Sequence, residues 1–537
     1  MGDNALTDIA WIRMRNGRAT LRDTLLHAHE PEYQLDLSLP GFAISAELRL
    51  FAHVLAVVFR HLEHTTGEAR YVQILHILKN GLPSAAVDAA LAALEPGAHL
   101  LDPEMPFLQR PALPEQKKND TARRLGPNDQ PVKKLLPSMP SDQGEDFWNL
   151  SFSSTGRLPV EDAVLHIAIA YFFLPAGNNN YDGDKCRMGT PAFRYPGKGK
   201  TATEVVWWGE TLLETLLLMT PRSWVKGDGL PAWADRTAAR SYDSGELHPL
   251  WRASWSSNTS VCHWEGTELT GVRIGGVPDA WFPPGISTDK DARKQWWDQR
   301  NIEDPFYLYR DGKAVRVDFG RDVTALAVEW AADSNLALAR ERSAASLLAP
   351  GSATLESNTR LLFIRHQVER DATSPSIGAS SVFVPDDAVW SFDVDEELID
   401  NIAEHATFVK ELLSDVVRPF RALNKKEKKI AASGQVLNVL DALKNQRDDA
   451  ANAFWRRIHD VYADLISSAT SETEIPMETY RRARNAALEA FDFVAAPHIG
   501  QYPAKIAFAR SRLDSTLSWR IRQRIAPVAT SEGDFDE

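Results

Sequence analysis

Cysteine is nearly absent from this chain of 537 residues, which contains only Cys186 and Cys262. Two thiols cannot supply a four-cysteine zinc site and give little ground for a disulfide framework, so the composition fits a reducing compartment. Long apolar runs are missing too, because the longest, such as 51–59 and 164–174, fall short of the roughly 18 residues that cross a bilayer. The N-terminus has no signal-peptide pattern, and we therefore expect a cytoplasmic protein without membrane contact.

The familiar catalytic and nucleotide-binding motifs are missing as well. The sequence has no G-x-S-x-G, no H-E-x-x-H, no C-x-x-C and no G-x-G-x-x-G after a predicted strand. GKGKT at 197–201 ends like a phosphate-binding loop, but that motif needs glycine where the chain has Arg194. No cofactor is expected on these grounds, and nothing in the spacing of the residues indicates an enzyme. A nuclease or hydrolase with dispersed carboxylates is the alternative, because acidic residues are plentiful.

Positive charge is in deficit overall but is unevenly distributed. The net charge of -13 argues against a protein covered all over in nucleic acid. Residues 418–526, however, contain 19 Lys or Arg against 12 Asp or Glu. Solvated helix faces explain most such runs, yet the sign bias favours contact with a phosphate backbone. One basic cluster comprises Arg418, Arg421, Lys425, Lys426, Lys428 and Lys429. The candidate phosphate contacts are Arg481, Arg482, Arg484, Arg510 and Arg512.

The chain is long enough for two or more domains, and its composition, 44% hydrophobic and 25% charged, is ordinary for a globular protein. Predicted helices alternate with short strands and hairpins over residues 1–388, which indicates a large irregular α/β domain. Residues 389–537 are helical alone and are predicted to form an antiparallel four-helix bundle. The expected bundle helices are 397–423, 435–469, 477–495 and 503–525. The expected fold class is α+β.

Within the N-terminal domain, residues 44–62 are predicted to form a strong helix. Helices are also predicted over 204–219 and 323–348, the latter ended by a Pro-Gly pair. Residues 361–368 are predicted to form a strand that leads into a polar turn.

A loop rich in glycine and asparagine follows a predicted buried helix at 159–174. Glycine and asparagine tolerate positive φ, and basic side chains come next, so backbone and positive charge can approach a phosphate or a groove together. The alternative is a long surface loop that carries these residues by chance. The candidate DNA contacts are Gly177, Asn178, Asn179, Asn180, Tyr181, Arg194, Lys198 and Lys200.

A second loop, residues 114–146, is polar, has six basic residues and shows no apolar period. Such a segment either becomes ordered on a partner or is a solvated linker. It includes Lys133 and Lys134. Phe147, Trp148 and Asn149 follow it, and the aromatic rings there either stack on unpaired bases or anchor the loop to the core.

Several short segments, taken in order, resemble the CasA family, the large subunits of the type I-E CRISPR surveillance complex Cascade. They are TDIAWI at 7–12, LLDPEMPFLQ at 100–109, KKLLP at 133–137, FWN at 147–149, GTP at 189–191 and AAPHIGQYPAKIAFARSRL at 495–513. No single motif decides the resemblance, which depends on their order and spacing and on the helical C-terminal region.

The resemblance implies an irregular α/β domain followed by a four-helix bundle, in a subunit that is not an enzyme. Such a subunit reads the protospacer-adjacent motif of double-stranded target DNA, mainly from the minor groove, and helps to open the duplex for the guide RNA. Its implied partners are the guide-RNA-bearing Cascade subunits and a separate helicase-nuclease, for which it provides the docking site.

Carried over residue by residue, the family's glycine loop falls on 177–181, where asparagine replaces glycine at three positions and fills space next to the groove. The loop that contacts the complex at the 5′ handle of the guide RNA ends at Phe147 and Asn149. The wedge, a side chain inserted beneath the motif, falls in the turn 367–373. The wedge candidates are Gln367, Arg370 and Asp371.

Some members of the family carry a cysteine cluster in the middle of the N-terminal domain. Only Cys262 and His263 stand in that region of this chain. Two ligands do not complete a tetrahedral zinc site, so no zinc is expected here.

Overall fold

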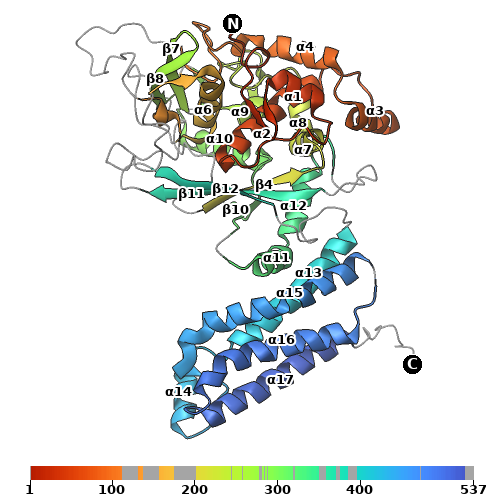
Figure 1. The fold of residues 1–537 in the computed structure, drawn as a ribbon, viewed down its shortest axis with the longest axis vertical. Helices are drawn as coiled ribbons and strands as arrows, with labels where there is room; N and C mark the ends of the chain where they lie inside the picture. Colours follow the sequence, from red (N-terminus) through yellow and green to blue (C-terminus); the bar gives the residue numbers. More distant parts are fainter. Residues whose placement is uncertain are drawn as a thin grey trace, which may run out of the picture. The chain divides into compact units, whose positions relative to one another are not determined.

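The computed structural model describes two compact units of the chain (Figure 1). The first comprises Met1–Val317 and Leu338–Pro385, and the second comprises Asp318–Ala337 and Asp386–Glu537. The second unit thus takes in Asp318–Ala337, which the division made from the sequence assigned to the N-terminal domain. The residues described are 2–111, 131–136, 156–174, 201–243, 245–256, 258–276, 281–283, 285–286, 288–317, 321–349, 359–370, 375–384, 396–471 and 473–525.

The core of the first unit is built around helix α2, Gly41–Val58, all 18 residues of which are buried. By length and composition α2 could cross a membrane, but it lies wholly inside the unit, as the core helix of a folded domain does. Helices α4, α6, α7 and α8 pack against it. The other α-helices up to residue 303 are α1 Leu21–His27, α3 Gly67–Asn80, α4 Ser84–Leu94, α6 Val160–Phe173, α7 Leu212–Met219, α8 Arg222–Val225, α9 Pro249–Ser254 and α10 Lys290–Glu303.

The strands of the first unit form small antiparallel sheets. One sheet has the order β12-β11-β4, a second has the order β3-β8-β7, and the remaining strands form three hairpins. The strands are β1 Ile12–Met14, β2 Gly17–Ala19, β3 Leu158–Pro159, β4 Thr201–Trp208, β5 Tyr242–Asp243, β6 Glu246–Leu247, β7 Asn258–Glu265, β8 Glu268–Gly276, β9 Tyr309–Arg310, β10 Lys313–Ala314, β11 Arg360–Arg370 and β12 Pro375–Phe383. The predicted α+β fold class is confirmed.

The helix predicted over 204–219 is wrong in its first part, because Thr201–Trp208 is strand β4. The sequence TEVVWW is rich in β-branched and aromatic residues, which fit a pleated sheet, and β11 supplies the neighbouring strand. The helix α7 begins only after Thr211. There the Thr211 side chain accepts from the Glu214 N–H, and the Glu214 carboxylate accepts from the Thr211 N–H, so a capping box sets the start.

The helix predicted over 323–348 is also wrong, because it is two helices. They are α11, Val323–Ala332, and α12, Asn335–Ser343. Ser334 lies between them with a φ of 57°, and an L-residue in this conformation cannot continue a right-handed helix.

The second unit is helical. Its long helices are α13 Glu396–Val417, α15 Arg447–Thr470, α16 Met477–Ala495 and α17 Pro503–Ile525. The ends of α16 and α17 are those predicted, whereas α15 begins later because Asp441–Gln446 is a 3-10 helix. Helix α15 packs on α13 and α16, and α17 packs on α16. The fully buried rings of Phe454 and Phe491 belong to their shared core, and α11 packs on α13.

Candidate nucleic-acid interface

Many of the residues predicted to contact nucleic acid lie outside the described residues. Helix α6 and strand β4, which bound the central loop on either side, are described, and both are anchored in the core of the first unit. The candidates outside the described residues are Phe147, Asn149, Gly177, Asn178, Asn179, Asn180, Tyr181, Arg194, Lys198, Lys200 and Asp371.

Lys133 and Lys134 lie on a short ordered turn. Residues Val132–Leu135 form a 3-10 helix in which Val132 and Leu135 are buried against β8 and α6. The absence of structure expected over 114–146 is therefore wrong for this part, because two apolar residues three positions apart fix one turn on the core. The two lysines between them are half-buried, so their amines are held close to the surface of the first unit.

The predicted wedge falls on the hairpin formed by β11 and β12. Strand β11 extends to Arg370, whose pair with Pro375 ends the ladder, and Gln367 pairs with Ala379 on the other side of a bulge. Gln367 and Arg370 therefore lie on paired strand backbone rather than in a turn. A register shift between Gln367 and Val368 marks a bulge, which twists the ladder just before its end.

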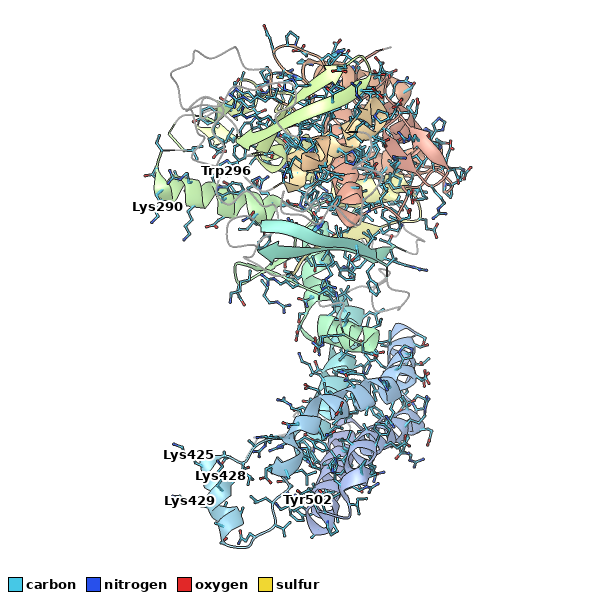
Figure 2. The ribbon with its side chains drawn as sticks, turned by 60° about the vertical axis from the view of Figure 1, so that its left-hand side comes forward. Lys290, Trp296, Lys425, Lys428, Lys429 and Tyr502 are labelled. Atoms are coloured by element: carbon cyan, nitrogen blue, oxygen red, sulfur yellow. The ribbon has the colours of Figure 1, made fainter. Side chains whose placement is uncertain are left out.

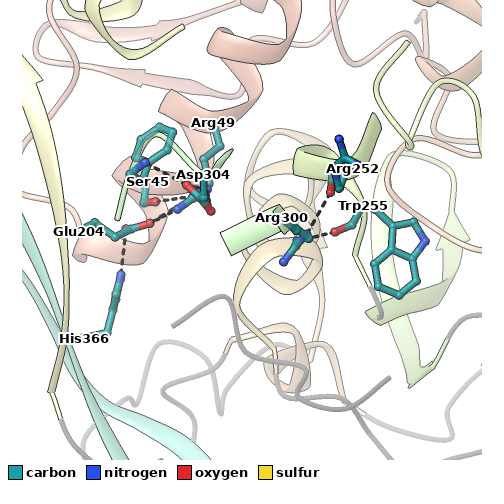
Figure 3. Close-up of polar contacts among 9 residues, drawn as sticks. Ser45, Arg49, Glu204, Arg252, Trp255, Arg300, Asp304 and His366 are labelled. Atoms are coloured by element: carbon teal, nitrogen blue, oxygen red, sulfur yellow. Dashed lines mark hydrogen bonds and ion pairs between the residues drawn. The ribbon is translucent and has the colours of Figure 1, made fainter. Parts of the chain in front are cut away.

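A buried polar network anchors this hairpin to α2 (Figure 3). The Arg49 guanidinium, 2% exposed, donates to both carboxylate oxygens of Asp304 at 3.1 and 2.9 Å, and its Nε donates to Glu204 at 3.2 Å. The other oxygen of Glu204 lies 3.0 Å from Nε2 of His366, whose side chain is fully buried on β11. One network thus joins α2, β4, β11 and the segment before β9.

The network continues from His366 to β12 and back to α2. Nδ1 of His366 lies 2.9 Å from Oγ of Ser380, and that oxygen accepts from the backbone N–H of Phe42 at 2.8 Å. The start of α2 approaches β11 and β12 so closely that only glycine fits at position 41. A Cβ on Gly41 would lie 2.6 Å from Cγ2 of Ile364 and 2.9 Å from Oγ of Ser380.

The charges of the network stabilise one another. Burial alone would raise the pKa of Glu204, but Arg49 and the hydrogen bond from His366 outweigh burial and hold that pKa below its ordinary value. Burial likewise opposes the charge of Arg49, and Asp304 and Glu204 outweigh it, so the pKa of Arg49 is raised. Glu204 and Arg49 therefore remain ionised at neutral pH, and each has several partners in the network. The network is suited to holding the hairpin rather than to proton transfer.

A second polar contact in Figure 3 joins α10 to α9. Arg300, on α10, donates from Nε to the carbonyl of Arg252 at 3.0 Å and from Nη2 to the carbonyl of Trp255 at 2.6 Å. Both acceptors are backbone oxygens at the end of α9, so Arg300 caps that helix end.

No group of three or more His, Cys, Asp or Glu side chains that could hold a metal ion occurs in the described part of the chain. Burial raises the pKa of the Cys262 thiol to about 12. At neutral pH this thiol is therefore protonated, whereas metal binding requires the thiolate.

Most of the arginines predicted to contact phosphates are paired with carboxylates of the second unit. Arg510 makes a bidentate pair with Asp492 at 2.7 and 2.8 Å, and Arg481 lies 3.3 Å from Glu478. Arg482 pairs with Asp464, and Arg484 with Asp514. Exposed pairs of this kind contribute about 0–1 kcal/mol and exchange readily, so Arg481, Arg482 and Arg510 remain accessible. Arg484 is half-buried, and the charge of all four arginines is partly compensated.

Arg512 differs from the other four arginines. It is exposed, and it makes no ion pair with any residue in the described ranges. Its charge is therefore available without first breaking an existing pair.

The comparisons with known proteins agree with this architecture. The family model of the CRISPR-associated protein Cse1 matches residues 5–492. The chain belongs to the CRISPR-associated Cse1 family. The predicted resemblance is thereby confirmed.

Among solved structures, the Cse1 fold recurs over nearly the whole chain. Thermus thermophilus CasA (Cse1) has a TM-score of 0.55 at 17% identity, covering 97% of this chain and 100% of its own. Thermobifida fusca Cse1 has a TM-score of 0.54 at 15% identity, covering 97% of both chains. A chain of a CRISPR RNA-guided surveillance complex has a TM-score of 0.58 at 18% identity, covering 96% of this chain and 100% of its own. The search of curated protein sequences finds no match.

Sequence reasoning missed the network that supports the hairpin of this Cse1-family chain. Arg49, Glu204, Asp304 and His366 are far apart in sequence, and no motif joins them. One signal was available, because Arg49 stands in a helix that is apolar on all sides, and a charge in such a helix must have a buried partner. The partner's identity requires the fold.

Proposed function

We propose that this Cse1-family chain is the non-catalytic DNA-recognition subunit of a CRISPR RNA-guided complex. The observation that carries the proposal is the match of the family model to residues 5–492, supported by the shared fold with a subunit of a CRISPR RNA-guided surveillance complex. The chain acts in the cytoplasm, without membrane contact. It binds double-stranded target DNA, associates with guide-RNA-bearing Cascade subunits and provides the docking site for a helicase-nuclease.

The proposed division of labour follows the general logic of RNA-guided recognition, in which protein reads a short motif and base pairing reads the rest. The loop 177–181 enters the minor groove and reads the protospacer-adjacent motif, assisted by the basic residues up to Lys200. The hairpin of β11 and β12 carries the wedge that separates the strands. Its anchoring through Arg49 and Glu204 supports this role, because a wedge must resist the force with which the base pairs close.

The motif-reading proposal is tested by changing Asn179 and Asn180 to Val. A β-branched residue disfavours positive φ and cannot donate to base edges, so motif-dependent binding should be lost while weak, salt-sensitive binding remains. The matched control changes the same two residues to Gly, the residue type of the family's loop, and should still discriminate between motifs. Competition binding with duplexes of different motifs measures the result. If the Val variant ranks motifs in the wild-type order, the loop is not the reader.

The second unit is proposed to follow the DNA backbone through its arginines. Changing Arg481, Arg482 and Arg484 to Glu should weaken binding to all sequences alike and reduce the log–log salt slope by about 0.9 for each lost phosphate contact. An unchanged slope would assign these arginines to solvated faces. Metal-dependent DNA cleavage by the purified chain would contradict the non-catalytic assignment.

A further inference from the structure

Helix α14, Lys425–Ala432, lies at one end of the second unit and buries none of its residues (Figure 2). Polar contacts hold it instead. The Asn424 side chain accepts from the Glu427 N–H, and the Glu427 carboxylate accepts from the Asn424 N–H, both at 2.9 Å. Arg421 donates two guanidinium nitrogens to the same carboxylate at 2.7 and 2.6 Å. The helix is thus stabilised by a capping box and an ion pair rather than by apolar burial.

The only carboxylate on α14 is already occupied. The hydrogen bond from Arg421 is the largest cause that lowers the pKa of Glu427, to about 2, and the N–H of Asn424 adds to it. Glu427 is therefore ionised at neutral pH, and its charge is compensated by Arg421. It does not neutralise the lysines beside it.

Four exposed lysines make up the rest of the polar surface of α14. With 3.6 residues per turn they fall within an arc of roughly 160°, and Glu427 lies on the opposite side of the helix. Figure 2 labels three of them at the end of the unit. The lysine face, as we call it, comprises Lys425, Lys426, Lys428 and Lys429.

The lysine face is not compensated within the described part of the chain. None of its four ammonium groups lies within 4.0 Å of a carboxylate there, in contrast to Arg482 or Arg510, which have partners on neighbouring helices. The spacing also works against the isolated helix. Lysines three and four residues apart repel one another, and Lys425 and Lys426 stand at the positive end of the helix dipole. An anion bound to this face would relieve all of these repulsions.

We propose that the lysine face binds the phosphate backbone of duplex DNA without regard to sequence. The inference rests on the proposed function, since it assigns a part of DNA binding to this helix. Lysine is a compact, mobile point charge that suits successive phosphates along a strand, and such contacts position a duplex without reading bases. Phosphates of the duplex take the place of the carboxylates that the face lacks.

A protein partner fits the lysine face less well. Protein interfaces are depleted in lysine and obtain their affinity from buried aromatic and apolar anchors. Apart from lysines and Glu427, α14 offers only the half-buried Ile430 and two alanines. Charge without an apolar centre is the pattern of a polyanion site.

The test changes all four lysines of the face to Gln in the full-length chain. Gln has a helix propensity similar to that of Lys, and α14 buries nothing, so the fold should persist, which circular dichroism checks. Binding to a fluorescent duplex of about 30 base pairs, lacking any target motif, is titrated between about 50 and 200 mM salt. The log–log slope should fall by about 2 to 4, since each lost phosphate contact removes about 0.9.

A matched control removes the same formal charge from cations that already have carboxylate partners. Its slope should equal that of the wild-type chain. An equal fall in both variants would show a general effect of net charge and would overturn the inference. The control changes are Arg22→Gln, Arg157→Gln, Arg321→Gln and Lys410→Gln.

The remaining outcomes separate this inference from the proposed function. If the lysine variant keeps the wild-type slope on duplex DNA, the inference is wrong even though motif-dependent binding by the loop still stands. A variant that keeps its slope but no longer captures the helicase-nuclease would assign the face to a protein partner and overturn the inference as well. If the salt slope of the lysine variant falls on single-stranded DNA but not on the duplex, the proposal that the face binds duplex DNA is wrong. If the wild-type chain does not discriminate between motifs, the proposed function is contradicted, whereas the inference about the lysine face is not.

Discussion

The anchoring of the hairpin formed by β11 and β12 can be tested by changing Arg49 to Met. Arg49 is 2% exposed and is the only cation that contacts both Glu204 and Asp304 in the described part of the network. Met preserves much of the volume of the side chain but removes the guanidinium that lies between two carboxylates, whose side chains are 0% and 7% exposed. Removing one partner of a buried ion pair typically costs about 3–5 kcal/mol, because the remaining charge is buried without compensation.

Amide hydrogen exchange on the full chain measures this loss of stability in the strands that carry the network. The two units need not unfold together, so a single unfolding free energy would be ill-defined, whereas exchange reports the opening of particular strands. If the network holds the sheet, a loss of about 3–5 kcal/mol should accelerate exchange in β4 and β11 by roughly two to four orders of magnitude. Exchange in α16, which belongs to the other unit, should not change.

Two further variants decide whether charge is the reason. Adding Glu204→Gln to Arg49→Met removes one of the stranded charges, so the double variant should exchange more slowly in β4 than the single one. Arg22→Met serves as the control, because Arg22 pairs with Asp88 at the surface and should change stability by less than about 1 kcal/mol. The reasoning would be refuted if amides of β4 exchanged as slowly in Arg49→Met as in the wild-type chain. It would also be refuted if they exchanged faster in the double variant than in Arg49→Met.

Three other predictions concern pH and assembly. Burial raises the pKa of Glu47 to about 8, so the folded chain holds a proton that the unfolded chain releases. The thermal midpoint of the first unit, which contains Glu47, should therefore fall as pH rises from about 5 to 8, and Glu47→Gln should flatten this fall. Glu204 should have the opposite effect on stability, because its pKa is lowered in the folded chain. Its contribution to the free energy of unfolding is present above the pKa of the unfolded chain and is lost as pH falls through the folded pKa. Thermal unfolding of the first unit at acidic pH should show this loss. Changing Lys133 and Lys134 to Glu should spare the fold, because both are half-buried on an ordered turn, but reduce co-purification with guide-RNA-bearing subunits.

Local signals predicted the second unit well. Pro476 and Pro503 stand at the starts of α16 and α17, and proline there marks the boundary without reference to the rest of the fold. Strand β4 could not be predicted in the same way. Its sequence suits a buried helix as well as a strand, and the choice is made by pairing with β11, which lies some 150 residues later in the chain.

The candidate nucleic-acid interface could likewise be predicted only in part from the sequence. The loop residues could be proposed only because short motifs resemble a family, since a single sequence does not show which loops approach DNA. The basic clusters were visible, but their compensation was not. Arg482 and Arg510 each find a carboxylate 18 residues earlier on the neighbouring helix, whereas the lysines of α14 find none among the described residues. Which charges are available for a partner is a property of helix packing.

The proposed roles imply that affinity and discrimination should respond to different residues. Phosphate contacts position a duplex and act equally on every sequence, while base contacts and strand separation depend on the motif. Changes on α14 should therefore lower affinity evenly and leave the ranking of motifs intact. Weakening the network at Arg49 should instead leave the salt dependence unchanged, because its charges are buried and saturated, and should erode the step in which the hairpin separates the strands. A variant of Arg49 that altered only the salt slope would be incompatible with this separation, because no buried guanidinium can reach a phosphate.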